Sequence, residues 1–157
     1  MPAFLLQAIR NDVLWVSVIA GLLAQFLKPF TYWIRGETFE WGHIADTGGM
    51  PSSHSALVVA IATGVGIEQG FDSPLFAVAV GIAAVVTYDA AGVRRQAGEH
   101  ARALNEIITS LLKGHPIATI EFKEVLGHSR TEVIGGIIFG IGLMVLWKLG
   151  LQPLFLA

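Results

Sequence analysis

Four apolar stretches separated by polar ones organise the chain: residues 13–30 (running on to 34), 55–67, 75–88 and 133–149. A helix that crosses a membrane needs roughly 20 mainly apolar residues, with a lower limit near 17. The first and last stretches reach this length, whereas the two middle ones reach it only with their polar ends. Residues 70–74 (Gly-Phe-Asp-Ser-Pro) form a tight turn between the middle stretches, which predicts a helical hairpin rather than two separate buried helices.

A polar region, residues 94–130, separates the third stretch from the fourth. Its apolar residues recur at helical spacing, which predicts an amphipathic helix over residues 95–112, followed by a short helix over 120–126. The pattern therefore predicts one all-α domain, residues 1–157. We expect an integral membrane helical bundle of about four transmembrane helices plus one or two amphipathic helices.

Composition supports a membrane protein. The 157 residues are 54% hydrophobic and only 14% charged, and the mean hydropathy is +0.64. The absence of cysteine excludes a disulfide framework and a thiolate zinc site. A net charge of −2 argues against a nucleic-acid partner. The N-terminus has no basic segment followed by a cleavage site, so we expect the first apolar stretch to be retained.

Charge also predicts an orientation. With four alternating spans, residues 35–53 and 94–130, all five histidines and eight of the ten basic residues fall on one side. Basic residues accumulate on the cytoplasmic side of membrane proteins, so that side is predicted to be cytoplasmic, with both termini outside. Polar residues from three separate loops thus converge at one membrane face.

One stretch at that face has candidate chemistry: Asp46-Thr-Gly-Gly-Met-Pro-Ser-Ser-His-Ser55, directly before the second apolar segment. Its glycines and proline predict a turn, and Ser52 or Ser53 is suited to cap the following helix. The free N–H groups of a helix N-terminus attract anions such as phosphate, and His54 could pass a proton to such an anion. The alternative is an ordinary cap with His54 as an interfacial polar residue.

A second candidate lies before the last apolar stretch, in His128-Ser-Arg-Thr-Glu132. Ser129 and Glu132 have the spacing of a capping box, which is a purely structural role for the glutamate. Glu132 also lies four residues after His128, where its carboxylate can fix the imidazole in one tautomer and raise the basicity of the free ring nitrogen. The two roles are compatible.

These segments resemble the motifs of type 2 phosphatidic acid phosphatases and the related vanadium haloperoxidases, K-x6-R-P, P-S-G-H and S-R-x5-H-x3-D. The corresponding elements here are Lys28-x6-Arg35-Gly36, Pro51-Ser-Ser-His54 and His128-x3-Glu132. The fuller strings Gly-Gly-Met-Pro-Ser-Ser-His-Ser-Ala and Asp89-Ala-x-Gly-Val-Arg-Arg-Gln-Ala-Gly98 resemble a small divergent bacterial and plant branch of that superfamily.

The resemblance implies a role for each matching residue. His128 would be the nucleophile that forms a phosphohistidine, oriented by Glu132, and His54 would protonate the leaving group. The phosphate oxygens would be held by four further groups: Lys28, Arg35, Ser52 and the backbone N–H of Ser53. Charge-assisted donors of this kind suit phosphoryl transfer, in which positioning and electrostatics dominate.

Four positions depart from the superfamily pattern. Gly36 stands in place of proline, Ser53 in place of glycine and Glu132 in place of aspartate. The third-motif arginine is replaced by Phe122, with Lys123 next to it but out of register.

Arg94 and Arg95 could supply the missing guanidinium, or could be an anchor of basic residues at the cytoplasmic face. Arg94 also matches the motif spacing with His100, but Leu104 then stands where the acid should be. We therefore place the nucleophile at His128 and expect His100 on a helix surface. Asp89 is expected to pair with Arg94 or Arg95.

The remaining polar residues are expected to be structural. Asp46 is interpreted as a loop cap, and His43 and His115 as interfacial histidines. The spacing of histidines and acids matches no metal site, so neither a metal nor another cofactor is expected. Four glycines in the last stretch would allow close helix packing or pairing of two copies in a homo-oligomer: Gly135, Gly136, Gly140 and Gly142.

The resemblance implies a phosphatase, similar to acid phosphatases, that acts without metal on a lipid phosphate or pyrophosphate through a phosphohistidine. Its partners would be membrane lipid and an anionic phosphate-bearing substrate. The alternative is a non-catalytic membrane protein that binds an anionic headgroup or phosphate in the same pocket, which the missing third-motif arginine favours. Vanadate-dependent oxidation is a more distant alternative.

Overall fold

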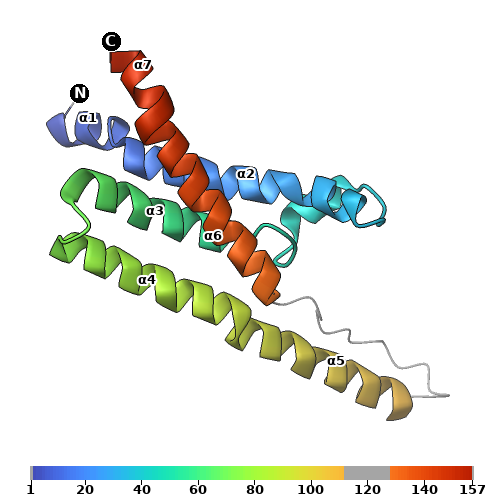
Figure 1. Cartoon of the computed structure of the whole chain (residues 1–157). Coiled ribbons are helices and arrows are strands. Elements are labelled where there is room, and N and C mark those ends of the chain that lie inside the picture. The colour runs from blue at the N-terminus through green and yellow to red at the C-terminus, as the bar shows by residue number, and fades with distance from the viewer. Residues whose placement is uncertain (1, 112–127, 157) are drawn as a thin grey trace.

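The computed structural model describes residues 2–111 and 128–156, without the side chains of residues 93–95, 99, 109–111, 155 and 156. Within these residues every regular element is helical, which confirms the all-α prediction (Figure 1). The elements are α1 (Ala3–Ile9), α2 (Asp12–Ile34), the 3₁₀ helix η1 (Trp41–Ala45), α3 (Ser53–Gln69), α4 (Pro74–Ala91), α5 (Val93–Leu111), α6 (Arg130–Val145), the π-helical segment η2 (Leu146–Leu151) and α7 (Gln152–Leu156).

Three helical segments of the described chain are long and apolar enough to cross a membrane: α2, the α4–α5 rod over Pro74–Ile108, and α6 with its continuation to Leu154. A helical membrane protein is therefore supported. Helix α3 has 17 residues, at the lower limit for a span. Its place as a fourth transmembrane helix stays a prediction.

Local capping rules position the helix starts. The side chain of Ser52 accepts a hydrogen bond from the backbone N–H of Ser55, so Ser52 rather than Ser53 caps α3. Ser73 caps α4 in the same way after Gly70, whose φ of +90° reverses the chain and forms the predicted hairpin. Ser129 and Glu132 form the predicted capping box of α6.

Helix α3 lies at the centre of the bundle and packs against α2, α4 and α6 (Figure 1). Its buried side is made of small residues, including Ala56, Ala60 and Gly64, which let the neighbouring helices approach closely. Helices α4 and α5 follow each other across Gly92, and α5 covers the amphipathic helix predicted over residues 95–112. The predicted helix over residues 120–126 lies outside the described residues.

The segment between α2 and α3 folds back onto α2. Trp41 packs against Phe26, Phe30 and Phe39, with ring centroids 5.1 to 6.3 Å apart. The Thr31 hydroxyl donates to the carbonyl oxygen of Met50 at 2.6 Å. These contacts bring the turn before α3 next to the C-terminal half of α2.

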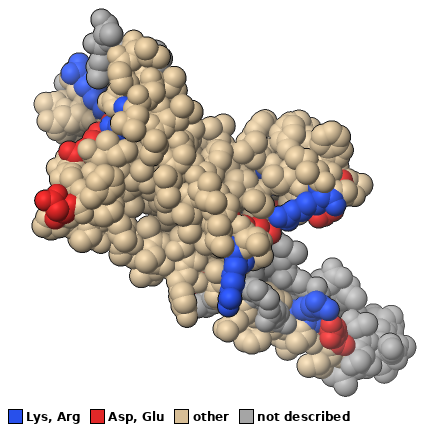
Figure 2. Space-filling view, in the orientation of Figure 1, with Lys and Arg blue, Asp and Glu red and all other residues tan. Residues whose placement is uncertain are grey.

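At the opposite end of the bundle, an ionic cluster around the buried Lys148 links several helices. Lys148 donates to Asp12 at 2.7 Å and also to Glu68, and the Trp147 indole N–H donates to Asp12 at 3.0 Å. These residues come from η2, the start of α2 and the end of α3, so the cluster ties three segments together. Figure 2 shows charged side chains at the two ends of the molecule and a largely uncharged surface between them.

Candidate functional site

The starts of α3 and α6 lie against each other because two glycines of α6 allow backbone contact. A Cβ at Gly136 would lie 2.4 Å from the Ser52 carbonyl oxygen, and one at Gly140 would lie 2.4 Å from that of Ala56. The backbone N–H of Ser52 also donates to the Glu132 carbonyl oxygen at 3.0 Å. Close packing, one of the two roles predicted for these glycines, thus joins the second and third motifs.

His128 is held rigidly between α4 and α6. Its backbone N–H donates to the carbonyl oxygen of Ala90 at 3.0 Å, and its side chain is only 2% exposed. Nδ1 lies 3.2 Å from Oε2 of Glu132. An ionised carboxylate can only accept, so Nδ1 carries the proton and the neutral ring keeps its lone pair on Nε2.

Nε2 of His128 is buried and has no hydrogen-bond partner among the described residues. Buried polar atoms are usually paired, and among the described side chains Ser17 Oγ and His43 Nε2 share this unpaired state. Because Nε2 of His128 is buried, a substrate that reaches it has to displace the atoms that now cover the ring.

Glu132 has both of the roles predicted for it. Oε2 accepts from the backbone N–H of Ser129 at 3.1 Å as well as from His128. Oε1 lies 3.8 Å from Nη1 of Arg35, which also contacts the sulfur of Met50 through Nη2 at 3.4 Å. One carboxylate therefore caps α6, orients His128 and attracts the guanidinium of the first motif.

His54 lies in the first turn of α3 with its ring centroid 6.5 Å from that of His128. A nucleophile and a proton donor each approach their reaction partner to about 3 Å. Two such contacts, one on each side of a phosphoryl group, span a distance similar to the separation of the two rings. His54 is exposed whereas His128 is buried. The structure thus places both histidines at the same end of the bundle, within reach of one phosphate.

Lys28 lies inside the bundle with only 1% of its surface exposed. Its ammonium donates to the Asp46 carbonyl oxygen at 2.6 Å, and it lies close enough to Asp46 and Glu132 for electrostatic attraction. A lysine ammonium has three donors, so one bond to a carbonyl leaves capacity for an anion. Lys28 lies in the C-terminal half of α2, and Arg35 is the cap residue that follows its last residue.

The two serines of the second motif differ in their hydrogen bonds. Ser52 is fully buried, and its hydroxyl accepts from the N–H and the hydroxyl of Ser55. Ser53 is the first residue of α3, where backbone N–H groups have no partner within the helix. The predicted contribution of the Ser53 N–H thus agrees with its place in the helix.

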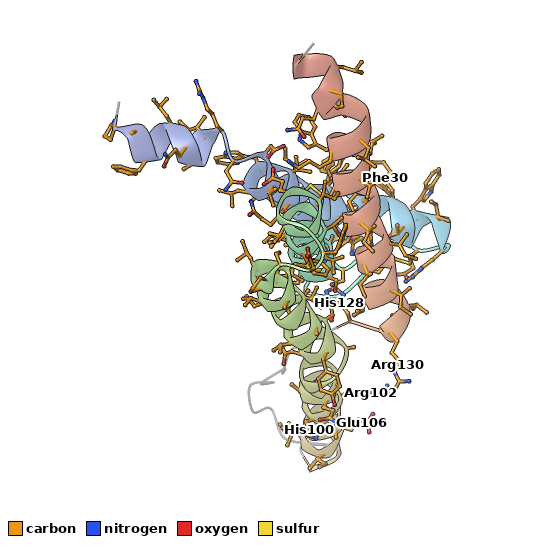
Figure 3. The ribbon with its side chains drawn as sticks, turned by 60° about the vertical axis from the view of Figure 1, so that its left-hand side comes forward. Phe30, His100, Arg102, Glu106, His128 and Arg130 are labelled. Atoms are coloured by element: carbon orange, nitrogen blue, oxygen red, sulfur yellow. The ribbon has the colours of Figure 1, made fainter. Side chains whose placement is uncertain are left out.

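The side chains of Arg94 and Arg95 lie outside the described residues, as do Phe122, Lys123 and His115. Which residue replaces the third-motif arginine therefore stays a prediction, and so does the pairing of Asp89. His100 lies on the exposed surface of α5, as expected, well away from His128 (Figure 3).

Several supporting contacts have no signal in the sequence because they use backbone carbonyl groups. The Ala90 carbonyl holds His128, and those of Ile44 and Asp46 accept from Gln25. Asp46, interpreted above as a loop cap, also binds Nδ1 of His43 at 2.9 Å, and this hydrogen bond raises the pKa of His43. The ring of His43 stacks on Tyr32, with centroids 4.2 Å apart.

No group of three histidine, aspartate or glutamate side chains among the described residues is arranged to hold a metal ion. The geometry instead presents two histidines, a carboxylate and two basic side chains at one end of a helical membrane protein. The sequence profile of the divergent PAP2 family matches residues 9–143. The chain therefore belongs to the divergent PAP2 family.

A relative from Bacillus subtilis (strain 168), the uncharacterised membrane protein YuiD, is 39% identical over 147 residues. The alignment covers 87% of this chain and 93% of the relative. No solved structure matches the chain.

Proposed function

We propose that the protein is a membrane phosphatase that hydrolyses a lipid phosphate or pyrophosphate through a phosphohistidine, without a metal ion. The observation that carries this proposal is the state of His128. Its Nδ1 is fixed by Glu132, and its Nε2 is buried without a partner among the described residues. The ring centroid of His54 lies 6.5 Å from that of His128. His43 shares the carboxylate-bound Nδ1 and the buried Nε2, so the feature that distinguishes His128 as a nucleophile is the second histidine, His54, beside it.

The chemistry follows from these positions. Nε2 of His128 attacks phosphorus, the bond from phosphorus to the leaving oxygen breaks, and protonated His54 gives its proton to that oxygen. Water then attacks the phosphohistidine, the nitrogen–phosphorus bond breaks, and neutral His54 takes the proton of the water. Glu132 accepts the hydrogen bond from Nδ1 of His128 throughout and stabilises the positive charge that develops on its ring.

The basic residues would stabilise the negative charge of the phosphoryl group. Lys28 and Arg35 would bind the non-bridging phosphate oxygens, together with the Ser52 hydroxyl and the Ser53 N–H. Lys28 lies in α2 and Arg35 directly follows it, and Arg94 or Arg95 is expected to complete the set from the start of α5. By the excess of basic residues, we propose that this end faces the cytoplasm.

A second candidate function is binding of a phosphate or anionic headgroup without turnover. One observation favours it: Lys28 already donates to the Asp46 carbonyl, so fewer of its N–H donors are free for a transition state.

Phosphate release by the purified protein in detergent separates the two. The substrates are phosphatidic acid, diacylglycerol diphosphate, a prenyl diphosphate and p-nitrophenyl phosphate, with a chelator present. If the protein is a phosphatase, we expect it to release phosphate from at least one of these substrates. Release from none, while vanadate or phosphate still raises the melting temperature, would establish the binding protein instead.

His54→Ala tests the general acid. Loss of a positioned proton donor is expected to lower kcat about 10²- to 10⁴-fold for a lipid phosphate, whose alkoxide leaves poorly without a proton. p-Nitrophenyl phosphate has a good leaving group, so the same variant should lose less than about tenfold on it. The check is kcat for both substrates with one enzyme preparation. Equal losses on both would show that His54 does not protonate the leaving group.

A further inference from the structure

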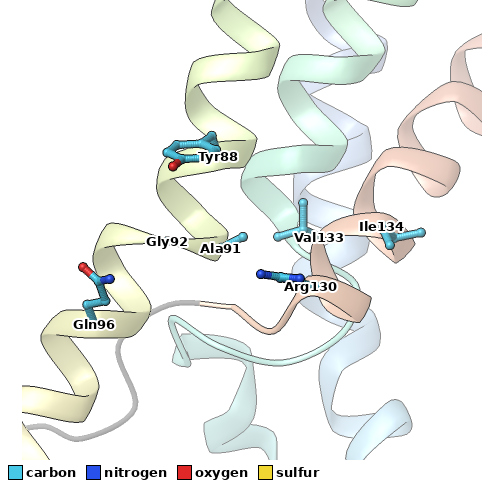
Figure 4. Close-up of a pocket in the computed structure, with 7 residues that line it drawn as sticks. All are labelled: Tyr88, Ala91, Gly92, Gln96, Arg130, Val133 and Ile134. Atoms are coloured by element: carbon cyan, nitrogen blue, oxygen red, sulfur yellow. The ribbon is translucent and has the colours of Figure 1, made fainter.

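A cavity of about 700 Å³ opens beside the candidate site, between the α4–α5 junction and the start of α6 (Figure 4). Its described lining contains three polar side chains, those of Tyr88, Gln96 and Arg130. Arg130 extends from α6 toward the end of α4 at Ala91 (Figure 4). The resemblance assigns no role to Arg130 or to this cavity.

The described residues that line the cavity carry a net positive charge. Arg130 is its only charged side chain there, and no described residue forms an ion pair with it. Asp89 lines a neighbouring hollow, which shares Tyr88 with the cavity. Arg130 is the first residue of α6, where the helix dipole disfavours a cation, so capping of α6 does not explain its presence.

The cavity adjoins the residues of the proposed chemistry. Ala91 follows the residue whose carbonyl holds His128, and Val133 follows Glu132. Arg130 is two residues from His128, so their Cα atoms are at most about 7.6 Å apart, twice the spacing of consecutive Cα atoms. A group in the cavity and a phosphate at His128 could thus belong to one molecule.

An apolar groove of about 780 Å³ lies beside the cavity, between the same two helices and α3. Thr87 of the groove lies one turn before Ala91 of the cavity in α4, and Ile137 lies one turn after Val133 or Ile134 in α6, so the two linings share the same faces of these helices. A polar, positively charged cavity at the helix ends is thus followed along the helices by an apolar groove. This combination matches an amphipathic anion.

On the basis of the proposed function, we propose that Arg130 binds a second anionic group of the substrate, beside the phosphate attacked by His128. The substrate class is then a lipid diphosphate, or a lipid phosphate with another charged headgroup, whose chain lies in the groove. Arg130 is a specificity-determining residue in this account, and Gln96 adds a neutral hydrogen-bond donor.

The test compares two lipids that differ only in the second anionic group, diacylglycerol diphosphate and phosphatidic acid with the same chains. For Arg130→Gln, loss of a charge-assisted contact should raise KM about tenfold or more for the diphosphate and less than about twofold for the monophosphate. Arg130→Lys should recover part of the loss. Arg102→Gln is the matched control, because Arg102 is an exposed arginine of α5 whose partner is Glu106.

The outcomes are distinct. Equal KM changes for both lipids, or the same change in Arg102→Gln, would overturn the assignment of Arg130. If the wild type hydrolyses neither of these two lipids, their KM values cannot be compared, and the proposed function fails only if the other substrates named above also release no phosphate. Equilibrium binding of the two lipids, followed by tryptophan fluorescence, then decides the inference: a preference for the diphosphate that Arg130→Gln abolishes supports it, and an unchanged preference overturns it.

Discussion

His128→Ala is expected to abolish phosphate release, with a loss of at least about a thousandfold in kcat on every substrate that the wild type accepts. The imidazole provides the only proposed nucleophile, and the substitution leaves Glu132 without the group that it orients. Unlike the His54 variant, this variant should not be rescued by a good leaving group, because the missing bond is the one to phosphorus. The measurement is kcat with a lipid phosphate and with p-nitrophenyl phosphate.

His100→Ala is the control for His128→Ala, since it removes an exposed histidine from α5 at the same end of the molecule. It should keep the wild-type rate. A His128→Ala protein that melts like the wild type and still turns over at a comparable rate would contradict the role of His128. If it melts at a much lower temperature, His128→Asn provides a polar replacement with which to repeat the assay.

Gly136→Ala is expected to be a strongly disruptive change in α6 although it adds only one methyl group. The added Cβ would lie 2.4 Å from the Ser52 carbonyl oxygen and 2.9 Å from Cβ of Ser55, where only backbone movement can relieve the overlap. Overpacking of this kind costs about 1–3 kcal/mol. Because the same contact holds α3 against the start of α6, activity should fall together with the melting temperature, both measured in one detergent.

Gly142→Ala is the matched control, since it makes the same change in the same helix where no atom lies within 4 Å of the new Cβ. Alanine is the better helix former by about 1 kcal/mol, so this variant should be as stable as the wild type or slightly more stable. Gly140→Ala, which meets the Ala56 carbonyl oxygen at 2.4 Å, should behave like Gly136→Ala. Equal melting temperatures for all three variants would mean that α6 does not pack on α3 as described.

Much of this architecture was predictable because it depends on local rules. Ser129 and Glu132 have a spacing that forms a capping box wherever a helix follows, and Ser73-Pro74 after a glycine predicts the start of α4. The approach of His54 to His128 was predictable for another reason. His54 precedes the second apolar stretch and His128 precedes the fourth, and in the expected four-span topology these two stretches begin on the same side.

Other features depend on tertiary packing, which leaves no pattern in the sequence. The choice of Ser52 over Ser53 as the cap follows from how α3 meets Glu132, since the backbone N–H of Ser52 donates to the Glu132 carbonyl. The cluster around Lys148 joins residues 12, 68 and 148. They meet because the start of α2, the end of α3 and the segment η2 lie at the same end of the bundle. The cavity at Arg130 likewise lies between the α4–α5 junction and the start of α6, and neither helix reveals it alone.

The most direct test of the central claim is the capture of the covalent intermediate. The protein is mixed with a lipid phosphate that carries a radioactive phosphoryl group and is quenched within its first turnover. We predict label that is stable in alkali, lost in acid, located at His128 by peptide mapping, and absent from His128→Ala. Steady phosphate release with no labelled protein, or label on another residue, would contradict the phosphohistidine mechanism.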